Sequence, residues 1–535
     1  MVNSLFHVGG KDFFTVGGQV NNSTTANPQI LERAFDTCVK LGLNTIAAPV
    51  SWEQFEPKEG HYDYDQITRL MTGARKHGLK LVVLWFGSWK NGNSHYVPRW
   101  VKLDKNRFRL AESFDGMEIR SLSPHCEESC MADARAFRAL CEFVARDNED
   151  ECVIGMQVEN EPGLIGAARD YSVEATALFQ QPVPEEITSF TGKTGRWEEV
   201  FGFYAAEYFT AFALAKYVNA VAAEGKKVLQ LPMYVNVWLG EMYAHIPGTN
   251  YPSGGAVTRT FSLWKHFTPD IDAISPDIYL ADFAGVDKLL QTYSGLGNPL
   301  YIPESSPAPL SMMNSMRAVA EYGLCGLHTF GIDHLAAAVD PEQLKLLASS
   351  GAEGSARASM LREMADAYRI LLNAKPLIEQ YQESGRLYAV CQYEGRANQV
   401  FDFGYYIGEV EYLNQESAPI NGGNVRRMDN RHRADSYSAY RAKGFIVQAD
   451  ESTFYITGDA FKLKLYPKFQ LEELTSALHA GDFLNTRTQG TLSVTEGFLD
   501  EQGEYQATVI RNGDETDYGY WVTSDVGVVR VEMDR

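Results

Sequence analysis

Short apolar runs alternate with amphipathic helical stretches as far as residue 378, and this rhythm constrains the fold more than any other feature. The apolar runs indicate buried strands at 13–20, 45–50, 80–86, 153–158, 228–235, 274–279, 300–303 and 323–330. Helices are predicted at 28–41, 64–77, 132–147 and 197–224, with a last one at 341–373. Eight such repeats predict an α/β fold, a (β/α)8 TIM barrel with insertions.

The alternative for this rhythm is a doubly wound open sheet. Such a sheet usually has a Gly-rich phosphate loop after its first strand, and Gly17-Gly18-Gln19 is not one. Long segments follow three of the predicted strands, at 87–131, 159–196 and 236–257. In a barrel all three lie on the C-terminal face, where the active sites of this fold sit. They predict a walled pocket, which favours exo action on a substrate.

The pattern changes after about residue 376. Short runs rich in β-branched and aromatic residues follow, at 387–393, 401–410, 444–448, 453–457, 461–465, 490–494, 505–512 and 528–532. Turn residues such as Asn512-Gly513 separate them, and the polar segment 416–436, with Arg426, Arg427, Arg431 and Arg433, indicates a solvated loop. We therefore divide the chain into a catalytic barrel, residues 1–378, and a smaller all-β accessory domain, residues 379–535.

Charge and cysteine content exclude several classes of protein. The 535 residues have a net charge of −21, and such an acidic surface repels nucleic acid. Seven cysteines show neither a disulfide framework nor zinc-knuckle spacing, and no His, Asp and Glu grouping has metal-ligand spacing, so no metal or cofactor is predicted. Without an apolar span or a signal sequence, we expect a cytoplasmic protein that does not contact membranes. A homo-oligomer is compatible with the sequence.

Two of the predicted strands end in acidic residues. The fourth is followed by Glu159, Asn160 and Glu161, and the seventh by Glu304. On a regular strand Glu159 and Glu161 would point to the same side, with Glu161 at the rim. Because the C-terminal ends of barrel strands share one face, Glu161 and Glu304 are expected to approach each other. Glycoside hydrolysis requires such a pair, one carboxyl protonated and the other ionised.

The environment of each carboxyl predicts its role. Glu161 is expected to donate a proton to the leaving oxygen, since burial and a nearby carboxylate would raise its pKa. Glu304 must stay ionised to attack the anomeric carbon, and Tyr279 at the end of the sixth strand is placed to hydrogen-bond it. Once the glycosyl-enzyme forms, the charge of Glu304 is lost, and Glu161 can act as a base on water.

Sugar binding needs aromatic surfaces and fixed polar groups. Asn160 can donate to a sugar hydroxyl, and the further candidates at strand ends are Trp52, Glu53, Trp85, Trp89, Asn236, Trp238 and His328. Trp85 and His328 are equally compatible with the packed core of a barrel. Trp89 and Trp238 lie in expected loops, where contact with a ligand is favoured over packing.

These residues resemble the clan A glycoside hydrolases, in which an acid/base Glu preceded by Asn ends the fourth strand and a nucleophilic Glu ends the seventh. More closely, the chain resembles the bacterial branch of glycoside hydrolase family 35, the β-galactosidases, including the uncharacterised β domain that these proteins carry. The matching stretches are 18–22, 44–53, 84–91, 157–161 and 302–304. The resemblance implies an exo-acting, retaining β-galactosidase with an oligosaccharide or glycoside as substrate.

One stretch departs from that pattern. The segment Leu84-Trp-Phe-Gly-Ser-Trp-Lys90 replaces the Pro-Gly-Pro-Tyr of better-known family 35 enzymes and is expected to line the subsite for the non-reducing sugar. A β-glucoside-active hydrolase, or a transglycosylase on β-gluco-oligosaccharides, is therefore the nearest alternative. A non-catalytic carbohydrate-binding barrel is the alternative of another class, and the presence of both carboxylates argues against it.

Overall fold

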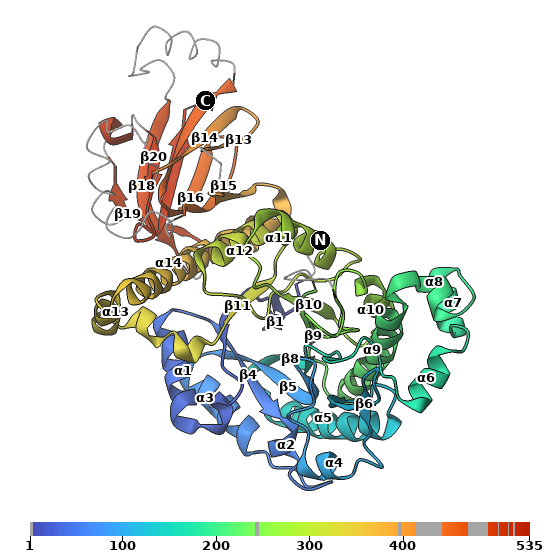
Figure 1. Cartoon of the computed structure of the whole chain (residues 1–535). Helices are drawn as coiled ribbons and strands as arrows, with labels where there is room; N and C mark the ends of the chain where they lie inside the picture. The colour runs from blue at the N-terminus through green and yellow to red at the C-terminus, as the bar shows by residue number, and fades with distance from the viewer. Residues whose placement is uncertain are drawn as a thin grey trace.

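The structure is a computed structural model of the chain (Figure 1). It describes residues 4–240, 246–393, 398–413, 441–468, 490–500, 502–511, 513–516 and 519–534. A helical part with a parallel sheet at its centre precedes a region of antiparallel strands, drawn in orange and red. None of the helices in the described ranges has the length and apolar character that a membrane span requires.

Seven parallel strands form the central sheet, in the order β10-β9-β8-β5-β4-β3-β11. Along the chain they are β3 (Thr15–Gln19), β4 (Thr45–Ser51), β5 (Lys80–Lys90), β8 (Val153–Asn160), β9 (Met233–Trp238), β10 (Ala273–Asp277) and β11 (Gly326–Phe330). Nearly every residue of these strands is buried, as expected for strands covered on both faces. Strand β5 continues four residues beyond the predicted end, and this extension carries Ser88, Trp89 and Lys90.

The predicted seventh strand closes the barrel through single bridges. Ile278 pairs with Ser305, and Ile302 pairs with Leu327, both in parallel. The N–H of Ile278 donates to the carbonyl of Glu304 (2.9 Å), and the N–H of Ile302 donates to the carbonyl of Gly326 (3.1 Å). Prolines 299 and 303 have no N–H to donate, so a regular ladder cannot form here. The predicted (β/α)8 barrel is confirmed.

Helices surround this sheet (Figure 1). They are α1 (Pro28–Lys40), α2 (Trp52–Phe55), α3 (Asp65–His77), α5 (Glu127–Asp147), α9 (Ala205–Lys226), α10 (Phe261–Phe267), α11 (Phe283–Tyr293), α12 (Pro309–Tyr322), α13 (Pro341–Ala348) and α14 (Ala352–Tyr381). The loops after β5 and β8 add α4 (Arg99–Leu103), β6 (Leu110–Glu112), β7 (Glu118–Leu122), α6 (Val173–Phe179), α7 (Glu185–Thr191) and α8 (Trp197–Phe201). A small hairpin, β1 (His7–Val8) and β2 (Lys11–Asp12), precedes β3.

Two predicted helices are interrupted at glycines. The stretch 197–224 divides into α8 and α9 around Gly202, and 341–373 divides into α13 and α14 at Gly351. Gly202 has a φ of 59° and Gly351 a φ of 97°, values that side chains with a Cβ rarely adopt. Helix α14 then continues past Pro376 and ends eight residues later than predicted.

The interior of the barrel is filled with large side chains at its N-terminal end. Phe6 packs edge-on against Tyr301 at 5.0 Å, and Tyr301 packs edge-on against Tyr234 at 5.1 Å. All three rings are fully buried. This packed layer leaves the C-terminal face as the end where a site can open.

The described strands of the C-terminal region form two antiparallel sheets, which confirms the predicted all-β character. One has the order β12-β15-β16-β21-β18-β19 and the other β13-β14-β17-β20. Their bounds are β12 (Leu387–Cys391), β13 (Asn398–Asp402), β14 (Tyr406–Tyr412), β15 (Lys443–Gln448), β16 (Thr453–Asp459), β17 (Phe461–Pro467), β18 (Thr491–Leu499), β19 (Tyr505–Ile510), β20 (Tyr520–Val522) and β21 (Val528–Met533).

The strand predictions in this region hold with two exceptions. The run 401–410 is two strands, because Gly404 turns the chain with a φ of 83° between β13 and β14. Strand β20 was not predicted, since three residues are too short for an alternating pattern. The polar segment 416–436 with its four arginines lies outside the described residues, as does Asn512.

Candidate active site

Three carboxyl groups meet at the C-terminal face of the barrel. Glu161 follows β8, Asp277 is the last residue of β10, and Glu304 lies in the closing segment between β10 and β11. One oxygen from each lies within 4.8 Å of the chosen oxygens of the other two. All three residues are buried, with at most 6% of their surface exposed. The structure therefore brings together the two acids indicated by the sequence, and adds a third.

A local twist of the backbone aims Glu161 into this group. Glu161 has a φ of 48° and Glu159 a φ of 63°, both in the left-handed region that residues with a Cβ rarely occupy. The Glu161 N–H donates to the side-chain oxygen of Asn236 on β9 (2.8 Å), which holds the twisted backbone. Strain of this kind persists only where surrounding contacts enforce it, and it is common at functional sites.

Glu159 points away from the cluster of three carboxyl groups. Its Oε2 accepts a hydrogen bond from the N–H of Trp89 (2.7 Å), and its other neighbour is the carboxyl of Asp133 on α5. The expectation that Glu159 and Glu161 share one side does not hold, because two left-handed residues break the alternation of a regular strand. Glu159 is thus part of the buried wall behind the site.

Three donors surround the carboxylate of Glu304. Gln19 on β3 donates to Oε1 (2.6 Å), and the hydroxyl of Tyr279 donates to Oε2 (2.9 Å). Asn160 approaches Oε1 at 3.5 Å, the long limit of a hydrogen bond. Hydrogen bonds to the charged form of a carboxyl favour that form. The surroundings of Glu304 therefore suit an ionised carboxylate whose two oxygens are held in a fixed plane.

Asp277 and Glu161 share a partner and face each other. The side-chain N–H of Asn236 donates to Oδ2 of Asp277 (2.7 Å), while the oxygen of Asn236 accepts from Glu161. Oδ1 of Asp277 and Oε2 of Glu161 are both buried, and among the described residues neither oxygen has a donor from outside this pair. Two facing carboxyl oxygens of this kind are satisfied when one proton lies between them.

The charges of the site explain the protonation of these groups. Burial is the largest cause, and the charge of Glu304 the second, that raises the pKa of Glu161 to about 7. Burial and the charges of Glu304 and Glu161 raise the pKa of Asp277 well above its usual range. A hydrogen bond from Asp277 and the ammonium of Lys90 oppose the rise at Glu161. Lys90, at the end of β5, donates to Oδ1 of Asn160 (2.9 Å) and is almost fully buried.

Three of the four tryptophans predicted to contact sugar lie inside the wall of the barrel. Trp52, Trp85 and Trp89 are fully buried. Their indole N–H groups donate to Glu56, Asp133 and Ser121, respectively, each at 2.8 Å. Trp89 was expected in a loop, but β5 extends through it. These indoles are therefore satisfied by the protein and brace the wall of the barrel.

The remaining candidates are placed differently from one another. His328 is buried beneath the site, where its Nδ1 pairs with the hydroxyl of Tyr301 (3.0 Å) and burial lowers its pKa to about 3. Glu53 is one-third exposed and pairs with Lys102 (3.0 Å). Trp238, the last residue of β9, is partly exposed. Glu53 and Trp238 are thus both partly exposed, but the carboxylate of Glu53 is already paired, which leaves Trp238 as the better candidate for contact with a sugar.

Sequence reasoning missed three residues of the site, namely Gln19, Lys90 and Asp277. Each ends a barrel strand, β3, β5 and β10, and each is a buried polar residue after an apolar run. As a criterion for catalytic acids, that pattern was applied to Glu161 and Glu304 alone. Applied to every strand, it would have found Asp277 two residues before Tyr279.

Comparison with known proteins is consistent with this geometry. A family model described as Beta-galactosidase, glycoside hydrolase family 42, matches residues 22–210. Over these residues the chain is similar to a β-galactosidase family of the clan A glycoside hydrolases. The matched residues include Glu161 and end before Glu304. The matching family is family 42, whereas the sequence motifs resemble family 35. A model of a domain of unknown function matches residues 364–523 of this glycoside hydrolase. A search of curated proteins finds no match.

Solved structures with a similar course of the chain include several glycosidases. The β-galactosidase of Bacillus circulans sp. alkalophilus aligns with 15% identity and a TM-score of 0.46, over 68% of this chain and 56% of that one. The β-amylase catalytic domain of Paenibacillus polymyxa aligns with 15% identity and a TM-score of 0.45, over 62% and 94%. The exo-β-1,4-mannosidase of Opitutaceae bacterium strain TAV5 aligns with 16% identity and a TM-score of 0.38, over 61% and 54%.

Proposed function

We propose that this glycoside hydrolase is a retaining exo-β-galactosidase in which Glu304 is the nucleophile and Glu161 the acid/base. The observation that carries the proposal is the closeness of the two carboxyls, with oxygens within 4.8 Å at the ends of different barrel strands. Retaining enzymes hold their carboxyl groups roughly 5–5.5 Å apart, whereas inverting enzymes leave about 6.5–9.5 Å for a water molecule.

The first half of the reaction uses the ionised Glu304 and the protonated Glu161. Glu304, held by Gln19 and Tyr279, attacks the anomeric carbon and forms a glycosyl ester. Glu161, with a pKa of about 7, gives its proton to the leaving oxygen as the glycosidic bond breaks. The leaving alcohol thus departs neutral.

The second half follows from the loss of charge at Glu304. While it is an ester, Glu304 no longer raises the pKa of Glu161, so Glu161 ionises more readily. The carboxylate then takes a proton from water as that water attacks the anomeric carbon. The ester bond breaks, Glu304 leaves as a carboxylate, and the sugar keeps its original configuration.

Asn236 and Asp277 act as positioning residues in this scheme. Asn236 holds both the backbone of Glu161 and the carboxyl of Asp277. The protonated Asp277 donates to Glu161 and keeps the pKa of that acid from rising further. Lys90 orients Asn160, which directly precedes Glu161 in the sequence and approaches Oε1 of Glu304 at 3.5 Å.

Galactose as the sugar is supported by the family model described as Beta-galactosidase. A β-glucoside-active hydrolase or transglycosylase keeps the same catalytic pair and differs in the subsite around β5. We also propose that residues 1–378 form the catalytic barrel and residues 379–535 the accessory domain. The sites for sugar contact, with Asn160 and Trp238 foremost, belong to the same proposal.

The test is covalent labelling combined with a substrate panel. A 2-fluoro β-galactoside should label Glu304, as read by peptide mass spectrometry, and Glu304→Ala should lose at least about 10⁴-fold in turnover. Glu59→Ala, a change at an exposed carboxylate far along the chain, serves as the control and should retain activity. Labelling of any other carboxylate would refute the assignment. Aryl β-galactoside and β-glucoside assayed in parallel decide the sugar.

A further inference from the structure

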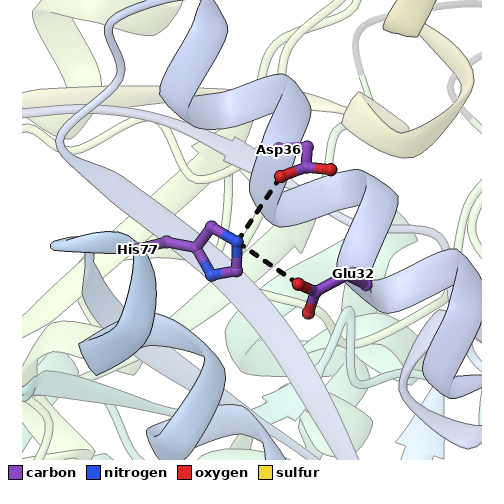
Figure 2. Close-up of side chains that lie close together, drawn as sticks. All are labelled: Glu32, Asp36 and His77. Atoms are coloured by element: carbon purple, nitrogen blue, oxygen red, sulfur yellow. Dashed lines mark ion pairs between the residues drawn. The ribbon is translucent and has the colours of Figure 1, made fainter.

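Side chains of metal-binding types also meet on the outer wall of the barrel, between α1 and α3. Glu32 and Asp36 are four residues apart on α1, so they share one face of that helix. His77 is the last residue of α3 and points its Nε2 at both carboxylates (Figure 2). That nitrogen lies 3.5 Å from Oε1 of Glu32 and 3.5 Å from Oδ1 of Asp36.

The ring of His77 is held in one orientation. Its side chain is only 10% exposed, and it stacks on Phe35 with centroids 5.1 Å apart and planes 8° apart. Nδ1 lies 2.8 Å from the carbonyl of Gly73, which can only accept, so Nδ1 carries the proton of the neutral ring. The lone pair on Nε2 then faces Glu32 and Asp36. Metal-binding histidines commonly donate their second nitrogen to a carbonyl in this way.

The spacing of the three atoms fits a small cation better than direct hydrogen bonds. Nε2 of His77 makes no hydrogen bond to either carboxylate at 3.5 Å among the described residues. Bonds of about 2.0–2.2 Å from Zn²⁺ to nitrogen and oxygen give ligand-to-ligand edges of about 3.3–3.6 Å in a tetrahedron. The two carboxylates are about half exposed, so their side chains can adjust the third edge.

The charges around the cluster also favour a dication. Like charges four residues apart on a helix repel each other. Lys76 pairs with Oε1 of Glu32, the oxygen that faces His77, and it is 62% exposed on a flexible stem. The Lys76 ammonium can move into solvent when a divalent cation binds to Glu32 in its place. A divalent ion would neutralise Glu32 and Asp36 together.

We propose that Glu32, Asp36 and His77 bind one Zn²⁺ ion, with water as the fourth ligand. The three ligands come from two helices that contact each other on the outside of the barrel, so the ion would clip α1 to α3. Sequence spacing could not indicate this set, because His77 lies 41 positions after Asp36 (77 − 36). An imidazole ligand selects Zn²⁺ over Mg²⁺ or Ca²⁺, which prefer oxygen.

The proposal is tested by calorimetric titration of the full chain after treatment with chelator. Wild type should bind Zn²⁺, and Zn²⁺ should raise its melting temperature, while Mg²⁺ should do neither. His77→Ala should weaken binding at this site at least tenfold and abolish the rise in melting temperature. His61→Ala is the matched control, since His61 also contacts a carbonyl through Nδ1 but is exposed, and it should bind as wild type does. Lys76→Ala should bind Zn²⁺ more tightly, because its competing ammonium is gone.

Asp36→Asn provides a second variant should His77→Ala fail to fold, and it too should weaken Zn²⁺ binding at least tenfold. Turnover of an aryl glycoside by each variant, unchanged from wild type, verifies the fold. Absence of Zn²⁺ binding to wild type would overturn the proposal and leave His77 as a structural contact between α1 and α3. Equal binding by wild type, His77→Ala and Asp36→Asn would overturn it as well, and inhibition of turnover would then assign the ion to Glu161, Asp277 and Glu304.

Discussion

Two buried glutamates of this molecule have similarly raised pKa values although their neighbouring groups carry opposite charges. Burial raises the pKa of Glu161, at the mouth of the barrel, to about 7, and burial does the same for Glu363 in α14. Glu161 faces two other carboxyls, Asp277 and Glu304. Glu363 makes an ion pair with Lys443 on β15, and both of these side chains are fully buried.

The difference shows that a perturbed pKa does not identify a catalytic acid by itself. At Glu363 the nearby ammonium opposes the effect of burial on the pKa, and the two groups form a closed ion pair that joins α14 to the C-terminal sheets. At Glu161 the second-largest cause is the charge of Glu304, a charge that the proposed reaction removes and restores. The neighbours therefore decide whether such a carboxyl can change its protonation during a cycle.

The largest expected effect that separates the two glutamates is on turnover. Glu161→Gln should lower kcat by about 10²–10⁴-fold for substrates with poor leaving groups, because general acid catalysis is lost. For an activated leaving group such as dinitrophenolate, which needs no proton, the first step should be nearly normal. Pre-steady-state kinetics should then show a burst followed by slow hydrolysis.

The matched variant for this comparison is Glu363→Gln. It should leave kcat within about twofold of wild type on both kinds of substrate, because Glu363 lies at the junction with the C-terminal sheets. An equal loss in the rate of the first, bond-breaking step for all leaving groups in Glu161→Gln would contradict the role of Glu161 as the acid. A leaving-group dependence in Glu363→Gln would remove the contrast between the two sites.

The next largest expected effect is on the free energy of unfolding, and it concerns Glu363. Lys443→Met should destabilise the fold by about 3–5 kcal/mol, because it leaves the buried Glu363 without its cation. With Lys443 gone, the pKa of Glu363 rises further. The loss should therefore be small at pH 5, where Glu363 is protonated, and grow as the pH rises through 7 and beyond.

Denaturant unfolding at pH 5 and pH 8 measures this loss. The double variant Glu363→Gln with Lys443→Met should recover part of the stability, since no buried charge remains. If Lys443→Met destabilises equally at both pH values, the lost interaction is packing of the lysine stem rather than its charge. Turnover of the folded variant should stay near that of wild type.

The sequence predicted the positions of the two catalytic acids but not the contacts that hold them. Glu161 and Glu304 follow apolar strands, and the period of the barrel places such ends on one face. The two left-handed residues Glu159 and Glu161 could not be foreseen, because nothing local requires them, and the contact that holds the twist comes from Asn236 on another strand. Asp277 was missed because Tyr279, two residues later, already supplied a plausible partner for Glu304.

The positions of Trp85 and Trp89 could not be predicted for a similar reason. A tryptophan at a strand end can line a pocket or fill the wall, and its indole N–H decides between these when a protein acceptor is present. Trp85 finds Asp133, and Trp89 finds Ser121, on segments far along the chain. The eight-repeat fold was predictable because it depends on periodicity, whereas these contacts depend on tertiary pairing.

The smallest effect, and the sharpest test of the comparison, is at Asp277. The alkaline limb of turnover should lie near pH 7, because Glu161 must be protonated to act and its activity falls as the pH rises through its pKa. A protonated Asp277 donates to Glu161 and lowers that pKa. Asp277→Ala removes the donor, so the limb should move to higher pH by roughly half to one unit.

Asp277→Asn should leave the limb nearly where it is in wild type. Its amide has the shape of the protonated acid: the N–H₂ can donate to Glu161, and the oxygen can accept from Asn236. Profiles of kcat against pH for the two variants make the measurement. A shift to lower pH in Asp277→Asn would mean that Asp277 is an anion in the working enzyme. Glu161 would then owe its raised pKa to two neighbouring charges, and its contrast with the cation-paired Glu363 would be stronger still.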